Sequence, residues 1–391
     1  MQKIDIQTQL EIIKRGAVEI ISEGELRKKI EESMRTKKPL NIKAGFDPTA
    51  ADIHLGHAVL LRKLRQFQDL GHKVYFLIGD FTARIGDPSG RSEKRKQLSP
   101  QEVLENAATY KKQVFKILDS DNTEVVFNSK WFDPMRGLEF GRLLTHYTAT
   151  RLLERNDFSS RLKEKKPLYM SELVYPILQG YDSVVLKADV EIGGTDQKFN
   201  LLVGRDLQQD FGQPKQVVIT MPLLEGTDGV QKMSKSLDNY IGINESPQEM
   251  FGKIMSISDK LMLRYYELLT AEDLEGVKKM HPKEAKLRLA ENIIGQYHPQ
   301  KEASRASQEF ERVFSQKELP QDMAEYKTDG TKTIISILLS SGLVKSGNEA
   351  RRLIKQGAIV FDNSPIDKEN FSPQRSGILK VGSRRFLKVV V

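Results

Sequence analysis

Two short segments carry residue types that could act on a phosphorylated compound. The first is Asp52-Ile53-His54-Leu55-Gly56-His57, whose two histidines are three residues apart and so share one face of a predicted helix. The N-terminus of a helix favours anions through its free N–H groups and its dipole, and two imidazoles add donors there. The segment therefore predicts a site for a phosphoryl group that gains charge in a transition state, and Gly56 leaves room for a flat base. Helix capping or plain surface exposure is the alternative for both histidines.

The second segment is Lys232-Met233-Ser234-Lys235-Ser236, preceded by Thr227-Asp228-Gly229. Two lysines three residues apart in a mobile loop can close on a polyphosphate, follow its charge as it develops, and open for release. A lysine-rich surface loop is the alternative, because runs of charge are usually solvated. The Walker loop GxxxxGK[ST] and the dinucleotide motif GxGxxG are both absent from the sequence, so nucleotide binding would rest on the two segments above.

The elements that must position these segments follow the pattern of a parallel sheet. A short apolar strand over residues 40–46, a helix from about 54 to 70 and a buried strand over 74–79 form a β-α-β unit. Ligands of such sheets bind at the carboxyl ends of the strands, because the connecting loops gather there. Residues 47–57 and 80–90 leave the sheet at this edge.

The remaining chain completes an α/β architecture with additional domains. After a mostly helical insertion, the sheet is predicted to resume near 184–186 and 217–219. The predicted parts, in chain order, are a Rossmann-like catalytic domain over 1–240 with the insertion at about 120–185, an α-helical domain over 241–320, a linker without periodicity over 321–330 and a small α+β domain over 331–391.

Composition and charge narrow the classes of function. The chain has no Cys, which excludes a disulfide framework, a thiolate nucleophile and a Cys-ligated zinc site. Apolar runs of a few residues are far shorter than the roughly 20 that a membrane-spanning helix needs, and the charged N-terminus does not resemble a secretory signal. We therefore expect a cytoplasmic protein with no membrane partner.

The positive charge is concentrated at the end of the chain. The net charge is +8, and residues 331–391 alone carry 11 Lys/Arg against 4 Asp/Glu, a net +7. A basic segment with apolar periodicity, following a nearly neutral body, predicts a nucleic-acid-binding module. A basic solubilising tail is the alternative.

Taken together, HLGH and a KMSKS segment about 175 residues later resemble the paired signature of class I aminoacyl-tRNA synthetases. Four further stretches extend a resemblance to bacterial-type tyrosyl-tRNA synthetases over essentially the whole chain: Gly45-Phe46-Asp47-Pro48-Thr49, Ile85-Gly86-Asp87-Pro88-Ser89-Gly90, Tyr175-Pro176-Ile177-Leu178-Gln179-Gly180-Tyr181-Asp182 and Ile192-Gly193-Gly194-Thr195-Asp196-Gln197. The resemblance implies ATP-dependent activation of L-tyrosine to tyrosyl-adenylate and transfer to tRNA(Tyr), by a homodimer. ATP accompanied by Mg²⁺ would be a substrate, with no tightly bound cofactor and no metal site within the protein.

The resemblance also assigns roles to individual residues. Those implied to bind tyrosine are Asp87, Tyr175 and Gln179 at the α-ammonium, Asp182 at the phenol hydroxyl and Gln197 along the amino acid. Those implied to line ATP and the adenylate are Gly45, Asp47, Gly56, Gly194, Asp196 and Lys235. Those implied to act on the phosphates are Thr49, His54, His57, Lys232 and Lys235.

Spacing supports one part of this assignment independently. Tyr175, Gln179 and Asp182 fall at i, i+4 and i+7, so they lie on one face of a single helix and can converge on one pocket. A solvated helix face is the alternative, and the apolar residues around them argue against it. One position departs from the family pattern, because Lys43 stands where the family form has a tyrosine that helps to bind the phenol. Lys43 remains a candidate for the tyrosine pocket and would either pair with Asp182 or turn away.

The C-terminal segment resembles an S4 RNA-binding domain, with two short helices followed by small strands. The residues implied to bind RNA, mainly through phosphates and shape, are Lys345, Arg351, Arg352 and Lys355. Three other functions stay open. A tryptophanyl-type synthetase usually lacks this module, and a nucleotidyltransferase of the HxGH superfamily would lack both the module and the Tyr175, Gln179 and Asp182 face. A non-catalytic S4 RNA-binding protein would have lost motif residues.

Overall fold

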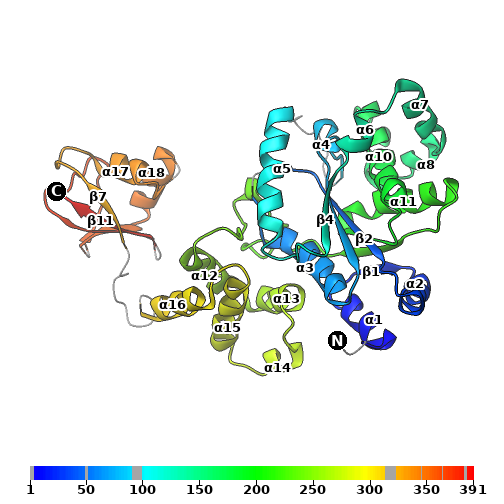
Figure 1. Cartoon of the computed structure of the whole chain (residues 1–391). Helices are drawn as coiled ribbons and strands as arrows, with labels where there is room; N and C mark the ends of the chain where they lie inside the picture. The colour runs from blue at the N-terminus through cyan, green and yellow to red at the C-terminus, as the bar shows by residue number, and fades with distance from the viewer. Residues whose placement is uncertain are drawn as a thin grey trace. The chain divides into compact units, whose positions relative to one another are not determined.

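The computed structural model of the chain describes residues 4–48, 52–89, 99–312, 323–344, 346–362, 364–382 and 385–391. It divides the protein into two compact units, Met1–Ala303 and Ser304–Val391 (Figure 1). The first unit therefore contains both the predicted catalytic domain and most of the predicted α-helical domain. In the part of the chain that is described, no helix combines the length and the apolar character needed to cross a membrane.

The first unit is built on a six-stranded sheet in the order β1-β6-β5-β2-β3-β4. Its strands are β1 Glu19–Ile21, β2 Asn41–Phe46, β3 Lys73–Ile78, β4 Thr123–Phe127, β5 Val190–Gly194 and β6 Val217–Met221. All neighbours pair in parallel except β1, which runs antiparallel to β6 at the edge. Every residue of β5 and β6 is buried, as expected for parallel strands that are covered by helices on both faces.

Helices cover the sheet and extend beyond it. They are α1 Ile6–Lys14, α2 Glu23–Thr36, α3 Leu55–Asp69, α4 Thr82–Ile85, α5 Pro100–Val114, α6 Ser129–Phe132, α7 Gly137–Thr145, α8 Ala149–Leu153, α9 Asn156–Lys163, α10 Met170–Leu186, α11 Lys198–Asp210, α12 Pro247–Met255, α13 Asp259–Leu269, α14 Leu274–Lys278, α15 Pro282–Gly295 and α16 Gln300–Phe310, with short 3-10 turns η1 Thr195–Gln197 and η2 Lys235–Leu237. Figure 1 shows α3 and α5 on one side of the sheet and α10 and α11 on the other. Apolar side chains of α10 and α11, including Leu178, Val203 and Leu207, share one buried cluster.

The predicted β-α-β unit is present as β2, α3 and β3. The apolar side chains Leu55, Val59, Leu64 and Phe67 of α3 are buried, which is why their helical spacing predicted this element. The chain leaves α3 at Gly71, whose φ of +89° lies in the left-handed region that glycine adopts without strain.

Two predicted boundaries in this unit are wrong. The strand expected at 184–186 is the last turn of α10, and the true strand is β5; Val184 packs in the helical cluster instead. A short apolar run fits a buried helix as well as a strand, so periodicity could not separate the two. The helical insertion, expected from about residue 120, begins only at α6 because β4 first adds an edge strand to the sheet.

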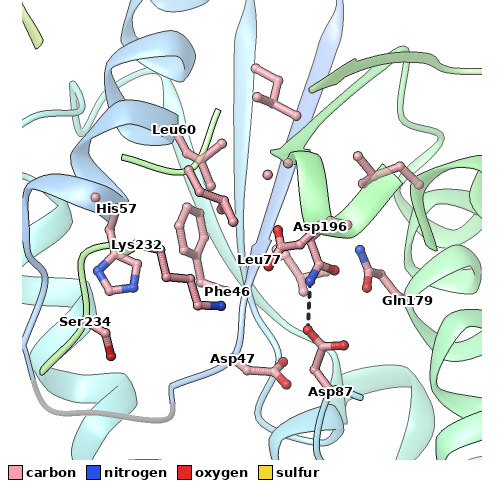
Figure 2. A pocket seen from close by; sticks show the side chains of 18 of the residues that line it. Phe46, Asp47, His57, Leu60, Leu77, Asp87, Gln179, Asp196, Lys232 and Ser234 are labelled. Carbon is pink, nitrogen blue, oxygen red and sulfur yellow. Dashed lines mark hydrogen bonds between the residues drawn. The ribbon is translucent and has the colours of Figure 1, made fainter. Parts of the chain in front are cut away.

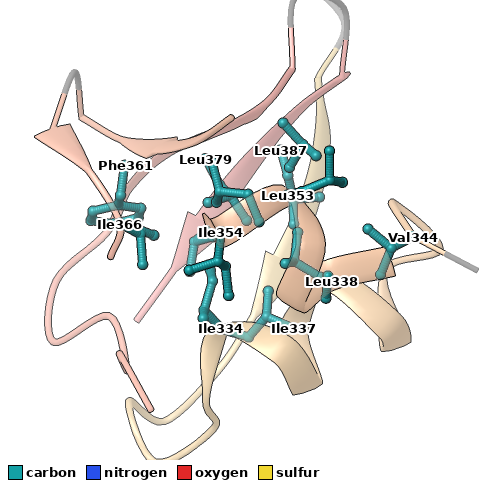
Figure 3. Packing of buried hydrophobic residues seen from close by; sticks show 14 residues of the cluster. Ile334, Ile337, Leu338, Val344, Leu353, Ile354, Phe361, Ile366, Leu379 and Leu387 are labelled. Carbon is teal, nitrogen blue, oxygen red and sulfur yellow. The ribbon is translucent and has the colours of Figure 1, made fainter. Parts of the chain in front are cut away.

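The second unit packs two helices on a five-stranded sheet in the order β7-β11-β10-β8-β9. Its elements are β7 Ala324–Lys327, α17 Ile334–Ser340, α18 Gly347–Lys355, β8 Ile359–Phe361, β9 Ser364–Pro365, β10 Gly377–Val381 and β11 Arg385–Val390. Figure 3 shows Ile334, Ile337 and Leu338 of α17 meeting Leu353 and Ile354 of α18 and side chains of the sheet in a single core. The unit therefore has its own apolar core, as expected of a folded module.

Part of the predicted linker belongs to this second sheet. Within residues 321–330, β7 pairs in parallel with β11, so the linker prediction is wrong at β7. The strand has no buried residue, because it lies at the edge of the sheet. Without a buried face it has no apolar alternation, and so no periodic pattern marks it as a strand.

Candidate active site

A cavity of about 600 Å³ opens at the carboxyl ends of β2 and β5. Figure 2 shows His57, Lys232 and Ser234 on one side of it and Asp87, Gln179 and Asp196 on the opposite side. The predicted site residues that line the cavity are Gly45, Asp47, His54, Gly56, His57, Asp87, Tyr175, Gln179, Asp182, Gly194, Asp196, Gln197, Lys232 and Lys235. Of the remaining two, Thr49 lies outside the described residues, and Lys43 is buried behind the wall of the cavity.

The two histidines are held by the first turn of α3. His54 is the N-cap residue, and its Nδ1 accepts the N–H of Gly56 at 3.1 Å. The Nδ1 of His57 accepts the N–H of His54 at 3.3 Å. In a neutral imidazole one ring nitrogen accepts and the other carries the proton, so each ring presents an N–H at Nε2.

The environment of these rings keeps them uncharged. Burial lowers the pKa of His54 to about 2, and its neighbours His57 and Lys235 lower it further. Burial and the charge of Lys235 lower the pKa of His57 to about 4. Both side chains are therefore neutral hydrogen-bond donors at neutral pH rather than fixed cations.

The lysine segment is docked against the start of α3. Met233 is buried, its N–H donates to the carbonyl of Leu224 at 2.8 Å, and its Sδ accepts the N–H of Gly56 at 3.3 Å. A Cβ on Gly56 would lie 2.9 Å from the His54 ring, so only glycine leaves this contact undisturbed. The Nζ of Lys235 pairs with Asp52 Oδ2 at 2.5 Å. Sequence reasoning placed Asp52 in the first motif but did not predict this partner.

Helix α10 carries three polar side chains into the cavity. The hydroxyl of Tyr175 donates to Asp47 Oδ2 at 2.8 Å, and Asp47 Oδ1 accepts from Thr82 Oγ1 at 2.9 Å. Gln179 Oε1 accepts from Asn200 Nδ2 at 2.9 Å. These partners fix the orientation of Tyr175 and Gln179.

Asp182 is the most buried of these three side chains, with 1% of its surface exposed. Its Oδ1 accepts from Trp131 Nε1 at 3.0 Å and its Oδ2 from Asn128 Nδ2 at 3.4 Å. Burial raises the pKa of Asp182 to about 7, against the opposing effects of Lys43 and of the two donors. Sequence reasoning missed Trp131 and Asn128. Trp131 is the one tryptophan in the 391 residues, and that rarity was the only feature in the sequence that could have drawn attention to it.

A second polar network adjoins α10 on the same side of the cavity. Asp87 Oδ2 accepts from Gln197 Nε2 at 2.8 Å, the bond that Figure 2 marks with a dashed line. The fully buried Asn200 donates to both Gln197 Oε1 at 3.3 Å and Gln179 Oε1, and so links this network to α10. Burial raises the pKa of Asp196, while the charge of nearby Lys232 lowers it. Asn200 was missed, because nothing in its local sequence distinguishes it from an ordinary helix residue.

Lys43 takes neither of the two positions expected for it. Its side chain is fully buried in the sheet and forms an ion pair with Glu191 Oε1 at 2.8 Å, rather than with Asp182 or with solvent. Glu191 lies opposite Lys43 in the parallel register of β2 and β5. The glutamate was not predicted, because a charged residue inside an apolar strand has no motif of its own.

The second unit presents basic side chains on α18. Arg351, Arg352 and Lys355 are exposed on this helix, and Arg351 pairs with Glu369 at 3.1 Å. Lys345 lies outside the described residues. The basic face predicted for this module is therefore present on the described part of it.

Comparisons with known proteins agree with this geometry. Residues 34–315 match the family described as tRNA synthetases class I (W and Y). The chain is 54% identical to the tyrosine–tRNA ligase of Carboxydothermus hydrogenoformans over 99% of its own length and 98% of that protein. It is 53% identical to the tyrosine–tRNA ligase of Aquifex aeolicus over 98% of its length and 99% of that protein.

A solved structure is similar as well. The crystal structure of tyrosyl-tRNA synthetase complexed with L-tyrosine from Archaeoglobus fulgidus superimposes with a TM-score of 0.62 at 26% identity, and the match covers 78% of this chain and 100% of that one. The fold, the two signature segments on one cavity and the similarity over nearly the full length agree. The chain belongs to the tyrosyl branch of the class I aminoacyl-tRNA synthetases.

Proposed function

We propose that the cavity at the carboxyl ends of β2 and β5 is where this tyrosine–tRNA ligase activates L-tyrosine and charges tRNA(Tyr). In the first step the tyrosine carboxylate attacks the α-phosphate of ATP, and pyrophosphate leaves. In the second step a hydroxyl of the terminal ribose of tRNA attacks the adenylate carbonyl, and AMP leaves. The carboxylate is already a nucleophile, so the protein contributes position and charge stabilisation. The observation that carries the proposal is that both signature segments and the α10 face line one cavity.

The phosphates would lie between α3 and the lysine segment. His54 and His57 would donate through Nε2, because their Nδ1 atoms are occupied by backbone N–H groups. Lys232 and Lys235 would neutralise charge as it moves onto the leaving pyrophosphate, and Thr49 would join them. ATP would enter with Mg²⁺ as part of the substrate.

Tyrosine would lie along α10. Asp87, Tyr175 and Gln179 would hold its ammonium, Gln197 would lie beside it, and Asp182 would accept the phenol hydroxyl. Hydrogen bonds that already hold each of these side chains support the assignment, because a preorganised site loses little energy to rearrangement on binding. The nucleotide would be lined by Gly45, Asp47, Gly56, Gly194 and Asp196.

The second unit would act as an S4-type RNA-binding module. Its basic helix α18, with Arg351, Arg352 and Lys355, and the adjacent Lys345 would contact tRNA phosphates, which is the sequence-independent part of RNA recognition. The net charge of +7 over residues 331–391 supports this role.

We also propose that the enzyme works in the cytoplasm as a homodimer. The helical insertion exposes large apolar side chains, with Leu138 at 69% and Met170 at 73% exposure. Exposed apolar groups on neighbouring elements favour burial against a partner, and a second copy would supply a matching surface. Sedimentation of the purified chain tests this, with a monomer as the contradicting result.

ATP–pyrophosphate exchange with each of the twenty amino acids tests the catalytic proposal. We expect exchange with tyrosine and little with any other. Exchange with tryptophan would indicate the other specificity of this family. Exchange with none of them would indicate either a nucleotidyltransferase of other specificity or an RNA-binding protein without this activity.

A further inference from the structure

We propose that the buried ion pair between Lys43 and Glu191 is a positioning element of the tyrosine pocket, which anchors the stretch of α10 bearing Gln179 and Asp182 and adjusts the charge of Asp182. The inference rests on the proposed function in one respect, namely that Asp182 receives the phenol. Lys43 has no exposed surface and does not itself line the cavity, but two of the residues that it contacts, Gln179 and Glu191, do.

The ammonium of Lys43 contacts three oxygens. They are Glu191 Oε1 at 2.8 Å, the main-chain carbonyl of Gln179 at 3.0 Å and Ser183 Oγ at 2.8 Å. Two of these contacts are hydrogen bonds and the third is an ion pair, so the buried charge of the ammonium is compensated. With no exposed surface, Lys43 cannot contact a substrate and can act only through these neighbours.

Those neighbours flank Asp182 on α10. Gln179 lies about one turn before Ser183, and Asp182 lies between them in sequence. Ser183 Oγ also donates to Glu191 Oε2 at 3.0 Å, so the lysine, the serine and the glutamate contact one another. Gln216 Nε2 donates to the same Glu191 oxygen at 2.5 Å and ties it to the chain segment before β6. The pair therefore fastens α10 to the centre of the sheet at the residues that form the pocket.

The same pair supplies the charges that face Asp182. From β2, Lys43 favours the carboxylate, and from β5, Glu191 disfavours it. From the α6 side, Trp131 and Asn128 donate to the carboxylate without carrying charge. The two members of the pair thus act on Asp182 in opposite directions.

Four variants separate these roles: Lys43→Met, Glu191→Gln, the double variant and Lys63→Met. The measurement is the ratio of kcat/KM for tyrosine to that for phenylalanine in pyrophosphate exchange, followed from pH 5.5 to 8.5, with a thermal melt of each variant. Lys63 is the matched control, because it is also a buried lysine, 2% exposed, whose Nζ contacts the carbonyls of Ile12, Ile13 and Arg15.

We expect the midpoint of the pH profile to rise in Lys43→Met and to fall in Glu191→Gln, each by on the order of one pH unit. The double variant should lie between them, and Lys63→Met should keep the wild-type midpoint. If Lys43→Met does not fold, the fall in Glu191→Gln still supports the proposal and an unchanged midpoint there still contradicts it.

Wild-type midpoints in both Lys43→Met and Glu191→Gln would overturn the proposal, even if both variants bound tyrosine more weakly. Shifts in the same direction would overturn it as well. Two other results would contradict the proposed function instead. The wild-type enzyme would show no tyrosine-dependent exchange, or Asp182→Asn would keep the wild-type ratio of kcat/KM for tyrosine to that for phenylalanine.

Discussion

The ring of His57 lies 3.9 Å from the ring of His54, and its Nδ1 accepts the backbone N–H of His54. Helix capping therefore occupies only Nδ1 of each ring and leaves Nε2 with its proton. Phosphate binding, the other use that the sequence suggests for this pair, is thus compatible with capping.

Substitutions at His54 should separate the two uses. His54→Asn retains a short side-chain acceptor for the cap but has no donor at the Nε2 position, so we expect near wild-type stability and a roughly 10²–10³-fold slower adenylation. His54→Gln extends an amide N–H further and should recover part of the rate. Single-turnover adenylate formation and tyrosine affinity are the measurements, and an unchanged rate in His54→Asn would remove this residue from the catalytic set.

Asp182 should lower the stability of the free enzyme as the pH rises. Its pKa is raised from 3.8 in the unfolded chain to about 7 in the folded one, so the folded state holds a proton that the unfolded state releases. The stability associated with that proton is complete below about pH 4 and is lost as the pH approaches 7. The free energy of unfolding of Asp182→Asn should therefore rise relative to that of the wild type between pH 4 and 8, by up to about 4 kcal/mol.

Urea unfolding at several pH values measures this difference. The control is Asp5→Asn, because the pKa of Asp5 is lowered by its hydrogen bonds with Thr8 and its effect has the opposite sign. A constant difference between Asp182→Asn and wild type across this range would show that Asp182 titrates in the folded protein as it does in the unfolded chain.

The pair between Lys235 and Asp52 should compete with ATP. If Lys235 must leave Asp52 Oδ2 to reach the phosphates, Asp52→Asn removes the competitor and should lower KM for ATP by up to about fivefold, since half-exposed pairs contribute at most about 1 kcal/mol. Lys235→Ala should slow adenylation, and the double variant should resemble Lys235→Ala alone. A higher KM for ATP in Asp52→Asn would instead mean that Asp52 helps to bind the nucleotide.

The basic face of α18 should affect tRNA binding and leave tyrosine activation unchanged. Replacing Arg351, Arg352 and Lys355 by Ala should leave tyrosine-dependent pyrophosphate exchange unchanged and weaken tRNA binding. The slope of the logarithm of the tRNA association constant against the logarithm of the salt concentration should become smaller by up to about three. The control is Lys388→Ala, which removes one positive charge from β11 where it pairs with Glu325. Equal tRNA charging by the triple variant and wild type would contradict the RNA-binding role of this face.

Local patterns predicted much of this molecule. The turn at the start of α3, the loop around Lys235 and the i, i+4, i+7 face of α10 depend on residues close in sequence, so their spacing alone indicated a shared site. The resemblance to a known family then joined segments that are far apart along the chain.

The supporting contacts could not be predicted in the same way. Trp131 and Asn200 contact Asp182 and Gln179 across 51 and 21 residues of sequence, and Lys43 reaches α10 across 136. Such contacts arise only when the fold brings α6, α11 and β2 against α10. Buried polar residues of this kind leave no periodic signal, because they interrupt the apolar pattern that identifies their strand or helix.

The most direct test of the central claim is the specificity of Asp182→Asn, measured as the ratio of kcat/KM for tyrosine to that for phenylalanine in ATP–pyrophosphate exchange. A buried acceptor that faces a phenylalanine ring stays unpaired, and this cost, about 1–3 kcal/mol or more, is what rejects the wrong amino acid. If Asp182 receives the phenol, this ratio should be at least about tenfold lower in the variant than in the wild type, mainly because kcat/KM for tyrosine falls. A ratio equal to that of the wild type would contradict the account and would place the phenol elsewhere.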